Sequence, residues 1–163
     1  MGARETQFRL VLLCTGNTCR SPLAAAAFRE ELGPDADRVE IVSAGTAAWD
    51  GQPASAGARE AAARAGLDVS THRSRRATPE LLRGADLVLV MEREHVRAAE
   101  TLGAEPGCTR VLSEWPEPGE PELAVSDPFG GSLEAYEECL RRIRSHVRRI
   151  VPRVREALRA HPA

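Results

Sequence analysis

The stretch FRLVLLCTGNTCRSP, residues 8–22, decides the architecture of this chain. Its apolar run Phe8–Leu13 has the length and composition of a buried strand. The next segment, CTGNTCR (residues 14–20), is polar and contains a conformationally permissive glycine. Ser21-Pro22 predicts the start of a helix, because serine is a favoured N-cap and proline suits the first helical turn. Residues 8–32 are therefore predicted to form a strand, a loop and a helix.

The remainder of the chain continues this alternation. Further strands are predicted at residues 38–42, 86–91 and 109–112, and further helices at 55–65, 92–102 and from 133 onward, with a short helix beginning at Thr78. Apolar residues recur at three- and four-residue steps from Leu133 to Leu158, which predicts a long amphipathic helix with a kink at Pro152. Strands alternating with helices predict an α/β fold with a parallel sheet between helical layers, and no linker divides residues 1–163 into more than one domain.

Composition excludes several classes of protein. The 22 basic residues, all arginine, against 24 acidic residues give a net charge of −2, which argues against a general nucleic-acid binder. No apolar run approaches the ~18 residues of a membrane span, so no membrane association is expected. Four cysteines are too few for a disulfide scaffold. Met1–Gln7 is polar rather than signal-like, and a cytoplasmic location is expected.

The loop after the first strand has the properties of an anion site. Successive backbone N–H groups from Thr15 to Arg20 can surround a phosphate-sized dianion, and the following helix points its positive end at the same place. The planar guanidinium of Arg20 can grip two oxygens, and the same field favours a thiolate at Cys14. Ser21 is close enough to donate to the sulfur. Cys14 is thus predicted to attack phosphorus, although a small buried residue at a strand end is the alternative. A nucleotide-binding P-loop would require a lysine, which the chain lacks.

Attack by a thiolate requires an acid for the leaving group, and Asp127 is the best candidate. It lies in a proline-rich segment, residues 114–131, and is followed by Pro128. A loop of this length is usually functional or mobile. An Asp-Pro turn without chemistry is the alternative, and Glu114, Glu117 and Asp50 are weaker candidates.

Four segments together resemble the low-molecular-weight protein tyrosine phosphatase family over almost the whole chain: VLLCTGNTCRSP (11–22), SAGT (43–46), the strand 86–91 and DPFGG (127–131). The resemblance implies a three-layer αβα fold with a four-stranded parallel sheet and the phosphate-binding loop between the first strand and the first helix. It implies no metal and no cofactor. Cys14 would be the nucleophile, Arg20 the phosphate binder and Asp127 the general acid. The phosphate-binding residues would be Thr15, Gly16, Asn17, Thr18, Cys19, Arg20 and Ser21, and the loop would be held by hydrogen bonds among Asn17, Ser21, Ser43 and His72.

Two positions bear on the substrate. Tyrosine-specific members carry a bulky aliphatic residue at the position of Thr18 and a tyrosine at that of Phe129, and the combination seen here is similar to the protein arginine phosphatase branch. A small hydroxyl residue leaves room and polarity for a guanidinium. The favoured substrate is therefore a phosphoarginine protein, and the alternative is phosphotyrosine. Trp49 is expected either to line the mouth of the site or to anchor its loop. A monomer or weak dimer is expected.

The other cysteines and the histidines leave further possibilities. In the family, a pair such as Cys14 and Cys19 can form a reversible disulfide; a packed thiol is the alternative for Cys19. Arsenate reductases of the same fold relay electrons through close cysteine pairs, whereas Cys108 and Cys139 are 31 residues apart, which makes that activity a remote alternative. A phosphoprotein-binding module would lack the nucleophile or the acid. The histidines lack zinc-ligand spacing: His72, His95, His146 and His161.

Overall fold

A four-stranded parallel sheet forms the centre of the computed structural model, which describes residues 8–118 and 124–160. Its strand order is β2-β1-β3-β4, with β1 at Phe8–Cys14, β2 at Val39–Gly45, β3 at Leu87–Val90 and β4 at Thr109–Val111. In the central register, Leu10 of β1 is paired with Ile41 on one side and Leu87 on the other. The expected α/β class is confirmed. The polar segment Met1–Gln7 and the middle of the proline-rich loop lie outside the described residues.

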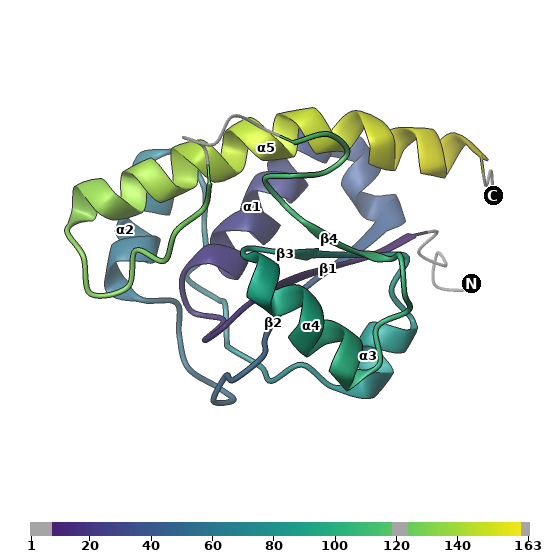
Figure 1. Cartoon of the computed structure of the whole chain (residues 1–163). Helices are drawn as coiled ribbons and strands as arrows, with labels where there is room; N and C mark the ends of the chain where they lie inside the picture. Colours follow the sequence, from purple (N-terminus) through teal and green to yellow (C-terminus); the bar gives the residue numbers. More distant parts are fainter. Residues whose placement is uncertain (1–7, 119–123, 161–163) are drawn as a thin grey trace, which may run out of the picture.

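Helices cover both faces of the sheet (Figure 1). One face carries α1 (Arg20–Leu32), α2 (Ala56–Arg64) and α5 (Leu133–Ala160), and the other carries α3 (Pro79–Arg83) and α4 (Arg93–Leu102). A 3₁₀ helix, η1 (Gly33–Arg38), follows α1. The three-layer arrangement follows from crossovers that place each helix on a face of a parallel sheet.

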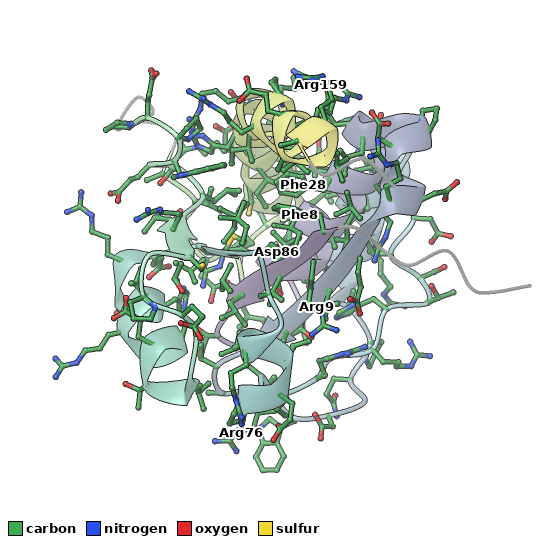
Figure 2. All side chains as sticks on the ribbon, turned by 90° about the vertical axis from the view of Figure 1, so that its right-hand side faces the viewer. Phe8, Arg9, Phe28, Arg76, Asp86 and Arg159 are labelled. Carbon is green, nitrogen blue, oxygen red and sulfur yellow. The ribbon has the colours of Figure 1, made fainter. Side chains whose placement is uncertain are left out.

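Strand β1 is buried on both faces, so its residues alternate between two apolar clusters. Leu10, Leu12 and Cys14 belong to the cluster under α1 and α5, while Val11 and Leu13 belong to the cluster under α3 and α4. Figure 2 shows the same alternation at the start of the strand, where Phe8 points toward Phe28 and the α5 layer and Arg9 points the other way. This period of two directs the Cys14 side chain toward the α1 layer.

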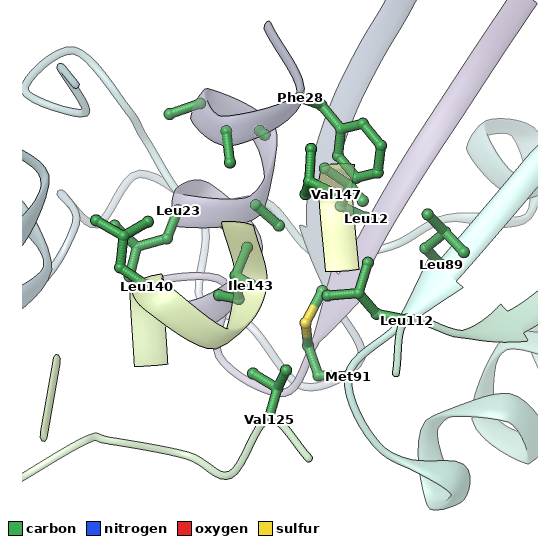
Figure 3. Packing of buried hydrophobic residues seen from close by; sticks show 14 of the residues in the cluster. Leu12, Leu23, Phe28, Leu89, Met91, Leu112, Val125, Leu140, Ile143 and Val147 are labelled. Atoms are coloured by element: carbon green, nitrogen blue, oxygen red, sulfur yellow. The ribbon is translucent and has the colours of Figure 1, made fainter. Parts of the chain in front are cut away.

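The apolar core extends to the proline-rich loop. Val125 is buried and packs near Met91 and Leu112 at the edge of the core that also contains Ile143 of α5 (Figure 3). Burial of an aliphatic side chain of this size contributes about 1.5–3 kcal/mol. This anchor fixes the loop two residues before Asp127.

Two local predictions are corrected by the structure. Helix α1 begins at Arg20 with Cys19 as its N-cap, because the Ser21 hydroxyl is bound to the Cys14 sulfur and is not used as a cap. Strand β2 continues beyond Val42 to Gly45, because its pairing with β1 extends to Cys14.

Helix α5 continues through Pro152 over 28 residues. Among the described residues, no helix has both the length and the apolar composition needed to cross a bilayer.

Candidate active site

The pocket that contains Cys14 lies at the carboxyl end of β1, between β2 and β3, where the order of the strands reverses. Ligands in open α/β sheets bind at such a point. The cavity has a volume of about 280 Å³. The polypeptide from Cys14 to Arg20 forms its floor, and four residues from other loops line it: Trp49, Gln52, Asp127 and Phe129.

The carbonyl groups of the loop point away from the pocket, because donors outside the loop bind them. Thr46 N and Ala47 N donate to the carbonyls of Cys14 and Thr15 over 2.9 and 3.0 Å. On the far side, Ser55 N donates to the Thr18 carbonyl over 2.9 Å. Carbonyl and N–H point in opposite directions across a trans peptide, so the amide hydrogens that follow these carbonyls face inward. The result is a concavity of backbone amides at the start of α1, an arrangement that can bind an anion.

Asn17 holds the rear of this loop. It is fully buried and has a φ of 56°, a left-handed conformation that asparagine tolerates better than most residues. Its Oδ1 accepts from Arg75 N over 2.8 Å, and its carbonyl accepts from His72 Nε2 over 2.7 Å. Its Nδ2 donates to Ser21 Oγ over 2.7 Å and to Ser43 Oγ over 3.1 Å. These bonds join the loop to β2, α1 and the segment 72–75.

The direction of these bonds determines where the Ser21 proton lies. Arg75 N–H can only donate, so it fixes the orientation of the Asn17 amide and makes Nδ2 the donor to Ser21. The Ser21 hydroxyl is then free to donate its own proton to Cys14 Sγ, 2.9 Å away. Asn17 N also donates to this sulfur over 3.3 Å. Two hydrogen-bond donors therefore converge on the Cys14 sulfur, which is only 3% exposed.

Arg20 is buried at the side of the pocket and is held by groups from two distant segments. Its Nη1 bonds to Glu92 Oε1 and, over 3.2 Å, to the Val125 carbonyl. Its Nη2 lies 3.8 Å from Asp127 Oδ2. A hydrogen bond from Glu94 and then the Arg20 guanidinium hold the pKa of Glu92 below its usual value, so the ion pair is retained at neutral pH. The guanidinium is thereby fixed beside the ring of amides.

Asp127 lies at the mouth of the pocket. Its Oδ1 accepts from Phe129 N over 3.1 Å, which leaves Oδ2 on the side of Arg20. The other acids considered from the sequence do not line the pocket: Glu114 pairs with Arg93, and Asp50 accepts from Arg76 N. Trp49 and Phe129 are 82% and 71% exposed, so two aromatic side chains stand at the mouth. Of the two expectations for Trp49, its exposure supports the lining position.

Sequence reasoning missed the roles of two residues at the start of α4: Glu92, which is the N-cap of the helix, and His95 in its first turn. Glu92 bonds to Arg20, and His95 Nε2 lies 2.9 Å from the Thr15 hydroxyl. Burial and then the charge of Arg20 lower the pKa of His95, against the opposing effects of Glu92 and Asp127. Both residues closely follow β3, a neighbour of β1, and the rule that parallel strands end at one edge could have indicated them.

The four cysteines are free thiols in different surroundings. Cys19 Sγ lies 3.2 Å from Ser55 Oγ and donates to Tyr136 Oη over 3.8 Å. Burial raises the pKa of Cys139 to about 12, so its thiol stays protonated. Within the described parts of the chain, no group of three or more His, Cys, Asp or Glu residues is placed to hold a metal ion.

The chain matches known proteins over most of its length. A family model for low molecular weight phosphotyrosine protein phosphatases matches residues 9–160. A probable low molecular weight protein-tyrosine-phosphatase, EpsP of Ralstonia nicotianae, is 36% identical over 147 residues, covering 90% of this chain and 95% of EpsP. A low molecular weight protein-tyrosine-phosphatase of Streptomyces coelicolor is 31% identical over 164 residues, covering 96% and 99%.

Solved structures show the same architecture. A mutant of the YwlE arginine phosphatase with a phosphorylated active-site serine superposes with a TM-score of 0.84 at 30% identity, covering 94% of this chain and all of that chain. The tyrosine phosphatase Wzb of Escherichia coli K30, in complex with sulphate, has a TM-score of 0.79 at 30% identity, covering 90% and 97%.

Proposed function

The chain belongs to the low molecular weight phosphotyrosine protein phosphatase family, and on this premise we propose that it hydrolyses phosphoarginine in proteins through a phosphocysteine intermediate. One observation carries the proposal. Cys14 Sγ receives hydrogen bonds from Ser21 and Asn17 at the base of an amide ring, with Arg20 beside it and Asp127 at the mouth. Nucleophile, anion binder and acid thus share one cavity.

In the first step, the Cys14 thiolate attacks phosphorus and forms a P–S bond while the P–N bond breaks. Asp127 donates its proton to the departing nitrogen of the phosphoguanidinium, so the product leaves as a guanidinium cation and Asp127 becomes a carboxylate. The loop amides and Arg20 bind the equatorial oxygens more strongly in the trigonal-bipyramidal transition state than in the ground state.

In the second step, water attacks the phosphocysteine. The Asp127 carboxylate now accepts a proton from the water, the P–S bond breaks, and inorganic phosphate and the Cys14 thiolate are released. The hydrogen bond from Ser21 stabilises the thiolate as leaving group. The phosphoserine in the YwlE mutant supports a phosphorylated intermediate by analogy, since the phosphoryl group there is on the active-site residue.

The chemistry is tested with p-nitrophenyl phosphate. Cys14→Ser is expected to abolish turnover, and Asp127→Asn is expected to slow it by ~10²–10⁴. Vanadate should inhibit the wild-type protein. Full activity of Cys14→Ser would refute the proposed nucleophile, and an unchanged rate in Asp127→Asn would assign the acid elsewhere.

The preference for phosphoarginine rests on Thr18 and on the acid loop. Thr18 lines the pocket, where a small hydroxyl residue leaves room for a guanidinium, and the Asp127 carboxylate formed by proton donation can pair with the departing cation. The similarity to the YwlE arginine phosphatase also supports it.

Phosphotyrosine is the second candidate, because Trp49 and Phe129 at the mouth offer aromatic surfaces to a phenyl ring. The names of EpsP and the Streptomyces protein also support it. The deciding measurement is kcat/KM on two peptides of one sequence, one with phosphoarginine and one with phosphotyrosine. A higher value for phosphotyrosine would overturn the proposed preference.

An arsenate reductase is disfavoured by the state of Cys139. A relay of electrons requires thiolates that exchange readily, and the raised pKa of about 12 keeps Cys139 protonated. A phosphatase needs no contribution from this residue.

A further inference from the structure

The Thr15 hydroxyl lies in the pocket wall, and the reaction described above does not use it. Thr15 is exposed, lines the cavity, and follows the nucleophile directly in the chain. Its Oγ1 is 2.9 Å from Nε2 of His95, which is only 4% exposed. An exposed side chain is thus held in place by a buried one.

The direction of this bond follows from the other nitrogen of the ring. Glu92 N–H donates to His95 Nδ1 over 3.2 Å, and a backbone N–H can only donate, so Nδ1 carries no proton. The ring proton therefore lies on Nε2, and His95 donates to Thr15 Oγ1. Burial and the charge of Arg20 lower the pKa of His95, which favours this neutral form.

A hydroxyl that accepts one bond retains its proton and a second lone pair. The structure gives Thr15 Oγ1 no further partner among the residues that it describes. His95 is bonded to Glu92, Glu92 bonds to Arg20, and Arg20 Nη2 lies 3.8 Å from Asp127 Oδ2, so the Thr15–His95 pair belongs to the side of the pocket where Asp127 stands. The backbone amides and Arg20 already serve the phosphoryl oxygens, which leaves the Thr15 hydroxyl for the leaving group.

We propose that Thr15 is a specificity-determining residue and His95 its positioning residue, together presenting a fixed polar contact to the leaving group of the substrate. The choice of leaving group rests on the proposed function. A phosphoguanidine carries N–H donors that can use the second lone pair of Thr15 Oγ1. A phenyl ring offers none, so the hydroxyl would be desolvated without compensation.

The test of Thr15 compares kcat/KM on the phosphoarginine peptide with kcat/KM on the matched phosphotyrosine peptide. Thr15→Val keeps the shape of the side chain and removes the hydroxyl, and it is expected to lower the phosphoarginine-to-phosphotyrosine ratio by ~2- to 10-fold. Thr15→Ser keeps the hydroxyl and should keep the wild-type ratio. Inhibition by vanadate should be equal in all three proteins, since the amides are untouched. An unchanged ratio in Thr15→Val overturns the proposal.

The test of His95 uses two amides of different length. The Gln side chain can place its N–H near the position of Nε2, whereas the shorter Asn side chain can replace only Nδ1. His95→Gln is therefore expected to keep the ratio, and His95→Asn to lower it as far as Thr15→Val does. In the Thr15→Val background, His95→Asn should lower the ratio no further, because the two residues act as one unit. An additional loss of the same size would overturn the positioning role.

The two proposals fail separately. A wild-type preference for phosphotyrosine, together with a lower phosphoarginine-to-phosphotyrosine ratio in Thr15→Val, would overturn the proposed substrate and support the role of Thr15 in selecting the leaving group. A wild-type preference for phosphoarginine, with the same ratio in every variant, would overturn the role of Thr15 and His95 and leave the proposed substrate in place.

Discussion

The rear and the front of the loop from Cys14 to Arg20 are held by hydrogen-bond relays of the same form. At the rear, Arg75 N–H fixes Asn17, Asn17 donates to Ser21, and Ser21 reaches the sulfur of Cys14. At the front, Glu92 N–H fixes His95, and His95 donates to Thr15. Each relay begins at a backbone donor whose direction cannot reverse, so each determines the position of a hydroxyl.

The two relays differ in where they end. The rear relay is buried and ends on Cys14, the proposed nucleophile, so we expect every substrate to depend on it. The front relay ends on an exposed residue of the pocket wall, where it contacts only part of a substrate. We therefore expect damage to the rear to reduce all activity and stability, and damage to the front to change the preference among substrates.

Asn17→Ala is expected to have the largest effect. It removes the partners of Ser21, Ser43 and Arg75 N and places alanine at a φ of 56°, so the free energy of unfolding should fall by about 2–4 kcal/mol. The misplaced loop should lower kcat/KM by ~10²-fold on both peptides. Urea unfolding and steady-state kinetics measure the two quantities. Thr15→Val is the front-side control, and an equal loss of stability in it would remove the distinction between the relays.

Gly45→Ala tests the support behind Thr15. A Cβ at residue 45 would lie 2.5 Å from the Thr15 carbonyl oxygen and 2.7 Å from Ala48 Cβ, both too close. The forced displacement is expected to cost about 1–3 kcal/mol and to lower activity on both peptides. Adding Ala48→Gly removes only the second overlap, so it should restore stability incompletely. Complete restoration would show that Ala48, and not the loop, is the obstacle.

Thr18→Ile should alter preference rather than overall activity. It replaces the hydroxyl with a larger apolar group in the pocket, and the phosphoarginine-to-phosphotyrosine ratio of kcat/KM is expected to fall by ~10-fold. Thr18→Val separates the loss of polarity from the increase in size. A phosphoarginine-to-phosphotyrosine ratio equal to that of the wild type in both variants would show that Thr18 does not select the substrate.

The smallest expected effect is on the pH dependence of stability. Burial is the first cause of a lowered pKa in both His72 and His95. The unfolded chain therefore takes up protons first as the pH falls below the usual imidazole value of ~6.5, and the folded state loses stability below that pH and keeps it above. Urea unfolding of the wild type, His72→Gln and His95→Gln between pH 7 and 5 measures this loss.

The two histidines should differ once they are protonated. His72 can keep its Nε2–H bond to the Asn17 carbonyl, whereas a proton on Nδ1 of His95 would face Glu92 N–H. Replacing His95 should therefore reduce the pH dependence of the free energy of unfolding more than replacing His72 does. A slope in His95→Gln equal to that of the wild type would contradict this assignment.

Local sequence patterns predicted the architecture because each depends on neighbours along the chain. The apolar run of β1 and the alternation of strands and helices were sufficient to predict the parallel sheet, and Cys14 was placed at its carboxyl edge. The N-cap of α1 was misplaced by two residues, since a propensity for N-caps favours Ser21 without showing that the Cys14 sulfur binds its hydroxyl. The roles of Glu92 and His95 were missed because neither belongs to a sequence motif.

The sequence by itself determined that a strand, a polar loop and a helix would gather backbone amides around Cys14, because strand formation and helix initiation are local properties of residues 8–32. Only the tertiary structure decided which distant groups fix that loop. Glu92 reaches Arg20 across 72 positions, and Thr15 and His95 are 80 positions apart. Such contacts depend on the packing of β3 against β1 and on the anchoring of Val125 in the core, and no local pattern encodes them.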